Sequence, residues 1–205
     1  MSSFLTGFFL GFSLILAIGA QNTFVLRQGI LGQHVFYVAF FCALSDAILI
    51  TIGIAGISLL FSSFLHQISN ILFGLSGLWL TGYGFLKLMT LFKSKKNIHI
   101  RSNEQKTLIQ TISILAVFTY ANPHVYLDTM ILIGSISQQF FGVERIYFAL
   151  GSITASFIFF FSLAYAAKSL SPMMDKPLAW IILDSLIAFI MFFIAIKLFY
   201  AGNWI

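Results

Sequence analysis

Six long apolar stretches constrain the fold of this chain more than any other feature of its sequence. An α-helix needs about 20 apolar residues to cross the ~30 Å hydrocarbon core of a bilayer, and each stretch reaches that length. The stretches cover residues 4–25, 35–61, 68–92, 108–136, 146–167 and 178–200. They are continuous and lack the ~10-residue alternating strands of a membrane β-barrel. The sequence therefore predicts an all-α membrane protein, a bundle of about six transmembrane helices forming one domain over residues 1–205.

The charge content agrees with a surface that faces lipid. Only 8% of the 205 residues are charged, whereas about 25% are charged in a soluble domain. The net charge of +5 is therefore interpreted as a marker of membrane orientation, and no nucleic-acid partner is expected. The single cysteine, Cys42, provides neither a disulfide framework nor a metal-binding cluster.

Most of the basic residues fall in alternate loops between the predicted helices. They are Arg27, then Lys87, Lys93, Lys95, Lys96, Arg101 and Lys106, then Lys168 and Lys176, with Arg145 and Lys197 on the other side. Loops rich in Lys and Arg stay in the cytoplasm, so six crossings would place both termini outside. If the first apolar stretch does not cross fully, the N-terminus would lie inside.

The two halves of the chain, about 1–97 and 103–205, show weak similarity. The stretch from Ala20 to Arg27 resembles the stretch from Ala121 to Asp128, and residues 85–88 resemble residues 195–198. Two copies of a three-helix unit must insert with opposite orientations, a common plan for secondary transporters with a site at the repeat interface. We expect an inverted repeat of three plus three helices. A chance match between two apolar sequences is the alternative.

Two aspartates lie inside predicted membrane helices. A carboxylate at the bilayer centre costs roughly 2.5–3.5 kcal/mol on insertion scales, so Asp46 and Asp128 are candidates for a substrate- and proton-binding site. The alternative is a buried aspartate that is paired with a lysine or capped by Ser and Thr. Pairing is not expected, because Arg27, Lys87 and Lys197 are predicted near helix ends, where they can reach the interface. Asp184 lies closer to the end of its stretch, where interfacial water could reach it, and is an accessory candidate.

Polar residues also mark a break in each half of the chain. Pro123 removes a helical hydrogen bond, and Asn122 before it is displaced from the helical region. Gln21 and Asn22 occupy the matching place in the first half. Broken helices at membrane depth expose backbone groups that can hold an ammonium or a carboxylate. Gln21, Asn22 and Asn122 are therefore predicted to bind the substrate, although a simple proline kink is the alternative.

Three further residues are accessory candidates. His124 follows the second break and could relay protons, because imidazole titrates near neutral pH, or it could serve only as a hydrogen-bonding helix residue. Ser45 and Tyr126 neighbour the two aspartates in the sequence. No catalytic residue, metal ligand or cofactor is predicted.

The energy source is expected to be an ion gradient, because the chain contains no GxxxxGK[ST] phosphate-binding loop. A deprotonated carboxylate can hold a substrate cation, and its protonation from outside can release that cation. The sequence therefore favours proton antiport through Asp46 and Asp128.

The residues around these sites resemble the LysE-type lysine/arginine exporters. The similar stretches are residues 16–29, Ala43 to Asp46, Ala121 to Thr129 and Phe148 to Ser152, and the resemblance covers nearly the whole chain. It implies a multi-pass protein of the bacterial inner membrane that exports arginine or lysine and is not an enzyme, with Asp46 and Asp128 as an essential pair. A homo-oligomer is compatible with it. The family commonly has proline where this chain has Ala20, and alanine permits a straighter first helix.

Other functions remain open at this point. A related transporter could export neutral amino acids such as homoserine or threonine, and the aspartates would then carry protons alone. A divalent-metal exporter could use the two carboxylates and His124 as ligands, but the sequence lacks a metal-ligand spacing such as CxxC or HxxxH. An intramembrane aspartyl protease would use both aspartates as a dyad, but neither is preceded by Gly-x-Gly. A membrane scaffold without transport would not explain the buried acids.

Overall fold

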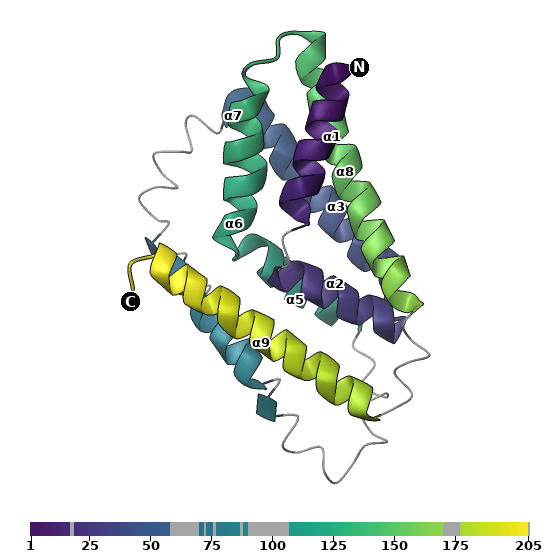
Figure 1. Ribbon diagram of the computed structural model, residues 1–205, viewed down its shortest axis with the longest axis vertical. Helices are drawn as coiled ribbons and strands as arrows, with labels where there is room; N and C mark the ends of the chain where they lie inside the picture. The colour runs from purple at the N-terminus through teal and green to yellow at the C-terminus, as the bar shows by residue number, and fades with distance from the viewer. Residues whose placement is uncertain are drawn as a thin grey trace.

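The computed structural model consists of helices and short connections over the residues that it describes, which are 1–16, 19–57, 70–71, 73–75, 77–86, 88–89, 107–169 and 177–204 (Figure 1). Within these ranges, three helical segments are long and apolar enough to cross a membrane: Val35–Ala55, Val143–Lys168 and Ile181–Tyr200. A bent pair of helices at the N-terminus brings the number to four if it forms one span. The chain is therefore a helical multi-pass membrane protein.

The described helices follow the predicted apolar stretches, with two of the stretches broken. Their bounds are α1 Ser2–Ile15, α2 Ala20–Leu31, α3 Val35–Ile52, α5 Leu108–Tyr120, α6 Pro123–Tyr126, α7 Ile133–Ser137, α8 Val143–Lys168 and α9 Pro177–Ala201. Two π-helical turns, η1 Gly53–Ile57 and η3 Leu127–Leu132, extend α3 and connect α6 to α7. The described residues between 70 and 89 contribute helical pieces. Several residues used to predict orientation lie outside the described residues: Lys87, Lys93, Lys95, Lys96, Arg101, Lys106 and Lys176.

The first apolar stretch is broken beside Gln21 and Asn22, where the sequence marks a break, although Ala20 stands where proline is common. The axes of α1 and α2 differ by 83°. Gly19 is extended, with φ −115° and ψ 179°, so α2 starts afresh at Ala20. The side-chain amide of Asn22 donates a hydrogen bond of 2.9 Å to the carbonyl oxygen of Ile15. This bond satisfies a carbonyl at the end of α1 that has no partner within the helix, so the break is stabilised without proline.

The second break lies where the sequence predicts it. Asn122 has extended backbone angles of φ −91° and ψ 109°, and Pro123 is the first residue of α6. Proline is well suited to that position because its missing N–H would have no helical partner. The Asn122 side chain accepts a hydrogen bond of 3.1 Å from the backbone N–H of His124 and so caps α6.

Close packing of α1 on α8 forms one wall of the bundle. A side-chain carbon at Gly7 would collide with the backbone carbonyl of Phe148, and one at Gly151 would collide with that of Phe4. The hydroxyl of Ser152 donates a hydrogen bond of 3.0 Å to the carbonyl of Gly7. Gly7 therefore lies in a contact face where small residues let two helices approach closely. α8 also runs along α2 and α3, and α9 crosses the opposite side of the molecule beside α2 (Figure 1).

Candidate functional site

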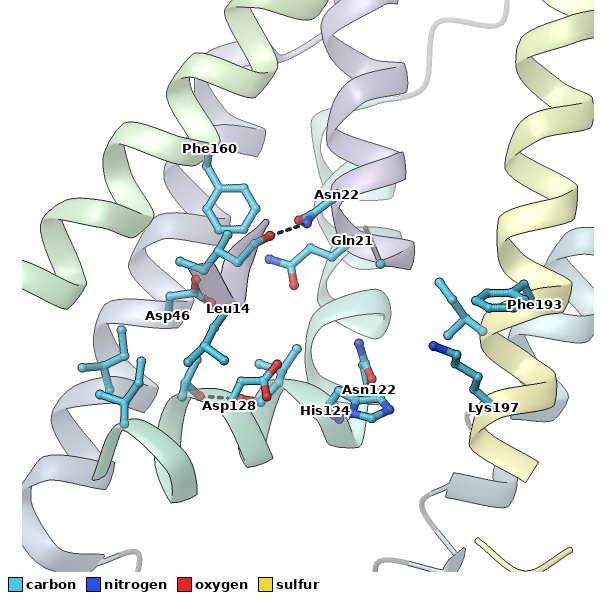
Figure 2. Close-up of a pocket in the computed structure, with 17 residues that line it drawn as sticks. Leu14, Gln21, Asn22, Asp46, Asn122, His124, Asp128, Phe160, Phe193 and Lys197 are labelled. Atoms are coloured by element: carbon cyan, nitrogen blue, oxygen red, sulfur yellow. Dashed lines mark hydrogen bonds between the residues drawn. The ribbon is translucent and has the colours of Figure 1, made fainter. Parts of the chain in front are cut away.

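A cavity of about 290 Å³ lies where the two helix breaks meet (Figure 2). This volume is close to the ~300 Å³ at the lower end for small-molecule sites. Its walls carry the apolar residues Leu14, Ile50, Phe160 and Phe193. Its polar lining consists of Gln21, Asn22, Asp46, Asn122, His124, Asp128, Thr129 and Lys197. Every residue predicted to bind substrate or protons thus lines one cavity.

Asp46 enters the cavity from the middle of α3. The residue is only 4% exposed, and its Oδ2 accepts a hydrogen bond of 2.7 Å from the hydroxyl of Ser156 on α8. Ser156 is fully buried, so α8 fixes the orientation of the carboxylate. Sequence reasoning missed Ser156, because a single serine in an apolar helix gives no sign of the residue that it faces.

Asp128 enters from the π-helical turn η3 and is half-buried. Only the four residues of α6 separate this turn from the break at Asn122. Among the described residues, the one ion pair within 4.0 Å joins Arg27 to Asp184. Neither Asp46 nor Asp128 is therefore neutralised by a Lys or Arg of the described part of the chain. Both carboxylates can take up a proton or hold a cation in the cavity.

The start of α2 contributes amide groups to the same cavity. Gln21 is 6% exposed, and its side-chain Nε2 has no hydrogen-bond partner. A buried amide donor in this state is suited to a ligand or to water. Asn22 uses its amide nitrogen to hold the end of α1, as Figure 2 shows by a dashed line. Gln21 therefore offers a donor to a bound molecule beside the buried thiol of Cys42, whereas Asn22 also maintains the shape of the break.

Lys197 on α9 also lines the cavity, whereas the sequence placed it near a helix end. Its ammonium nitrogen lies 4.8 Å from the centroid of the Phe193 ring, and in Figure 2 the side chain points from α9 toward Asn122. Sequence reasoning missed this residue because its position near the end of α9 is equally typical of a lysine that reaches the interface.

Ser45, Tyr126 and Pro123 support the site from outside the cavity lining. The hydroxyl of Tyr126 donates a hydrogen bond of 2.8 Å to the carbonyl of Tyr120. The hydroxyl of Tyr120 in turn donates one of 2.9 Å to Ser45 on α3. These bonds connect the break at Asn122 to the helix that carries Asp46. Pro123 is buried and begins α6.

Asp184 does not line the cavity, and the expectation that interfacial water wets it is wrong. Its side chain is 4% exposed and lies 3.7 Å from Nε of Arg27, whose side chain is 17% exposed. Arg27, which the sequence places near a helix end, is mostly buried by its pairing with Asp184. The pair is more consistent with a structural role than with direct contact to the substrate.

The described residues contain no group of three or more His, Cys, Asp or Glu side chains arranged to hold a metal ion. His124 lies in the cavity with the two aspartates, and its ring centroid lies 6.0 Å from that of Phe73.

Comparison with known proteins identifies close relatives over nearly the full length. The chain is 40% identical over 197 residues to the "Arginine exporter protein ArgO" of Pectobacterium carotovorum, covering 95% of each chain. It is 37% identical over 199 residues to the protein of that name from Photorhabdus laumondii, covering 97% of this chain and 95% of the relative. The protein of Pectobacterium atrosepticum is 39% identical over 202 residues, with 95% of each chain covered. No solved structure matches.

Residues 12–202 match the family described as "LysE type translocator". The match covers all of the cavity lining and confirms the resemblance inferred from the sequence stretches around both breaks. Its members are transporters rather than enzymes. This chain belongs to the LysE-type translocator family.

Proposed function

We propose that this protein exports arginine, and lysine by the same site, from the bacterial cytoplasm across the inner membrane in exchange for protons. The observation that carries the proposal is the presence of Asp46 and Asp128 in one cavity, with no Lys or Arg of the described residues within 4.0 Å of either carboxylate. Such a site attracts a cation with two positive groups. The names of the relatives, which are arginine exporters, support the identity of the cargo.

Transport requires the two carboxylates to alternate between substrate and protons. In the deprotonated state they hold the guanidinium and α-ammonium groups of arginine. Protons entering from outside neutralise the carboxylates, and the substrate leaves. Moving one positive charge outward costs about 2.3 kcal/mol per 100 mV of membrane potential, and inward movement of protons offsets this cost. A homo-oligomer is compatible with this cycle but is not needed for it.

The architecture that we propose is a six-helix inverted repeat. Each half begins with a broken apolar segment, α1–α2 in the first and α5–α6 in the second. Residues at or beside each break, Gln21 and Asn122 among them, line the same cavity. Two related units inserted with opposite orientations would bring their breaks together near the midplane, where secondary transporters bind their substrates.

The second candidate is export of neutral amino acids such as threonine. The cavity has amide groups that could bind the backbone of any amino acid, and the aspartates would then carry protons only. The cavity's two acidic groups favour the basic substrates, because a neutral amino acid would leave one carboxylate without a positive partner.

The test is efflux from proteoliposomes loaded with labelled arginine, lysine or threonine, under an imposed pH gradient that is acidic outside. We compare wild type with Asp46→Asn and Asp128→Asn. Glu144→Gln is the matched control, because Glu144 is exposed at the start of α8 and lies outside the cavity lining.

We expect gradient-driven arginine efflux that both aspartate variants abolish and the control retains. Transport that survives both substitutions would show that the acids are structural. Efflux that persists after collapse of both the pH gradient and the potential would contradict proton coupling. Threonine transported as well as arginine would establish the neutral alternative.

A further inference from the structure

We propose that Lys197 binds the α-carboxylate of the substrate and thereby selects amino acids against diamines that carry the same positive groups. The inference rests on the proposed function and assigns a role to a cavity residue that neither the sequence motifs nor the aspartate pair explains. It follows from the charges, the geometry and the substrate chemistry of the cavity.

The charges of the cavity are complementary to those of a basic amino acid. Asp46, Asp128 and Lys197 line the cavity together and carry two negative charges and one positive charge when ionised. Arginine and lysine carry the reverse set at neutral pH, with two positive groups and one carboxylate. Without Lys197, only neutral amide donors such as that of Gln21 would face the substrate carboxylate, and its negative charge would be left without a positive partner, which is costly inside the membrane.

The position of Lys197 is suited to this role. Its ammonium lies on α9, across the cavity from the α3 and η3 segments that carry the aspartates (Figure 2). Among the described residues no carboxylate lies within 4.0 Å of its nitrogen. Instead the nitrogen lies 4.8 Å from the ring centroid of Phe193. A ring face attracts a cation without accepting its hydrogen bonds as a carboxylate does, so the N–H donors of Lys197 stay available for a ligand.

The consequence is discrimination against substrates that lack a carboxylate. Agmatine and cadaverine are the decarboxylated forms of arginine and lysine, and each carries two positive charges. Two aspartates alone would bind them at least as well as the amino acids. With Lys197 present, a bound diamine leaves this ammonium without its anion and adds like-charge repulsion. Specificity of this kind comes from a repulsive element as well as from an attractive one.

The experiment measures competition and transport in proteoliposomes. Labelled arginine transport is recorded with increasing agmatine, cadaverine or arginine methyl ester, whose carboxylate is blocked. The proteins are wild type, Lys197→Met, which keeps the length of the chain without the charge, and Lys197→Arg, which keeps the charge. The control is Lys168→Met, because Lys168 is exposed at the end of α8 and lies outside the cavity lining.

In wild type we expect the inhibition constants of agmatine and of the methyl ester to be at least about tenfold higher than that of unlabelled arginine. Lys197→Met should raise the KM for arginine about tenfold, and agmatine should then compete as well as arginine. Lys197→Arg should restore the preference, and Lys168→Met should behave as wild type. The change in the ratio of the two competitors is the decisive result, because a general loss of structure would weaken both equally.

Two results would overturn the assignment while leaving the export of arginine in place. One is a Lys197→Met protein that transports arginine and still rejects agmatine. The other is a wild type for which arginine methyl ester competes as well as arginine, and this comparison requires no substituted protein. Absence of arginine transport by wild type would instead contradict the proposed function itself, so the two failures are distinguishable.

Discussion

Ser156 on α8 donates a hydrogen bond of 2.7 Å to the carboxylate of Asp46 on α3. The two residues come from different halves of the chain, and both are buried. The bond therefore fixes an acidic group of the cavity to the longest described helix. A displacement of α8 relative to α3 would therefore change the surroundings of Asp46, as the proton exchange proposed above requires.

Ser156→Ala is expected to slow arginine transport by about tenfold. A hydrogen bond to a charged group contributes roughly 1.5–3 kcal/mol, and its loss leaves the Asp46 carboxylate less well oriented. The measurement is the initial rate of arginine efflux at saturating and subsaturating substrate. Ser152→Ala is the matched control, because Ser152 lies one turn away on the same helix and bonds the carbonyls of Gly7 and Phe148 instead. Equal effects of both substitutions would contradict a specific role for Ser156.

The pair of Arg27 and Asp184 is expected to stabilise the fold without contacting the substrate. Removing one partner leaves the other charge buried, which costs about 3–5 kcal/mol. Asp184→Leu should therefore lower the thermal unfolding temperature markedly in detergent. Removal of both charges in Arg27→Met/Asp184→Leu should recover most of the loss, since a buried pair is often replaceable by apolar residues.

The same variants distinguish a structural pair from a binding pair. The double variant should retain the wild-type KM for arginine, because neither residue lines the cavity. A folded double variant with a strongly raised KM would place the pair on the substrate's path.

Ala20→Pro is expected to be tolerated. Ala20 is the first residue of α2, where a backbone N–H has no helical partner and proline is favoured. Gly19 before it already has the extended backbone that a residue preceding proline requires. The free energy of unfolding should stay the same or rise by about 0.4–1 kcal/mol, because proline restricts the unfolded chain.

Val25→Pro is the comparison for this prediction. Val25 lies inside the same helix and is fully buried, so proline there should cost about 3 kcal/mol or more. Thermal unfolding and arginine efflux are measured for both proteins. Inactivity of the Ala20→Pro protein at normal expression would show that the break needs a backbone N–H at this position.

Much of the candidate site could be predicted from residues that are costly in a membrane. Asp46 and Asp128 stand out in an apolar sequence, and Pro123 marks a break because of its own backbone geometry. These signals are local, since each depends on one residue and its immediate neighbours. The break before Ala20 was harder to predict, because it is stabilised by a side chain seven residues away, that of Asn22 on Ile15.

The sequence by itself determined that this protein is helical, lies in a membrane and carries two acidic groups within it, because the transfer of charges and backbone groups into lipid is governed by residue type. Only the tertiary structure decided which residues share the cavity. The contacts of Ser156 with Asp46 and of Arg27 with Asp184 join helices far apart in the chain. The same holds for Lys197, which lies near a helix end in the sequence but lines the cavity because of how α9 packs.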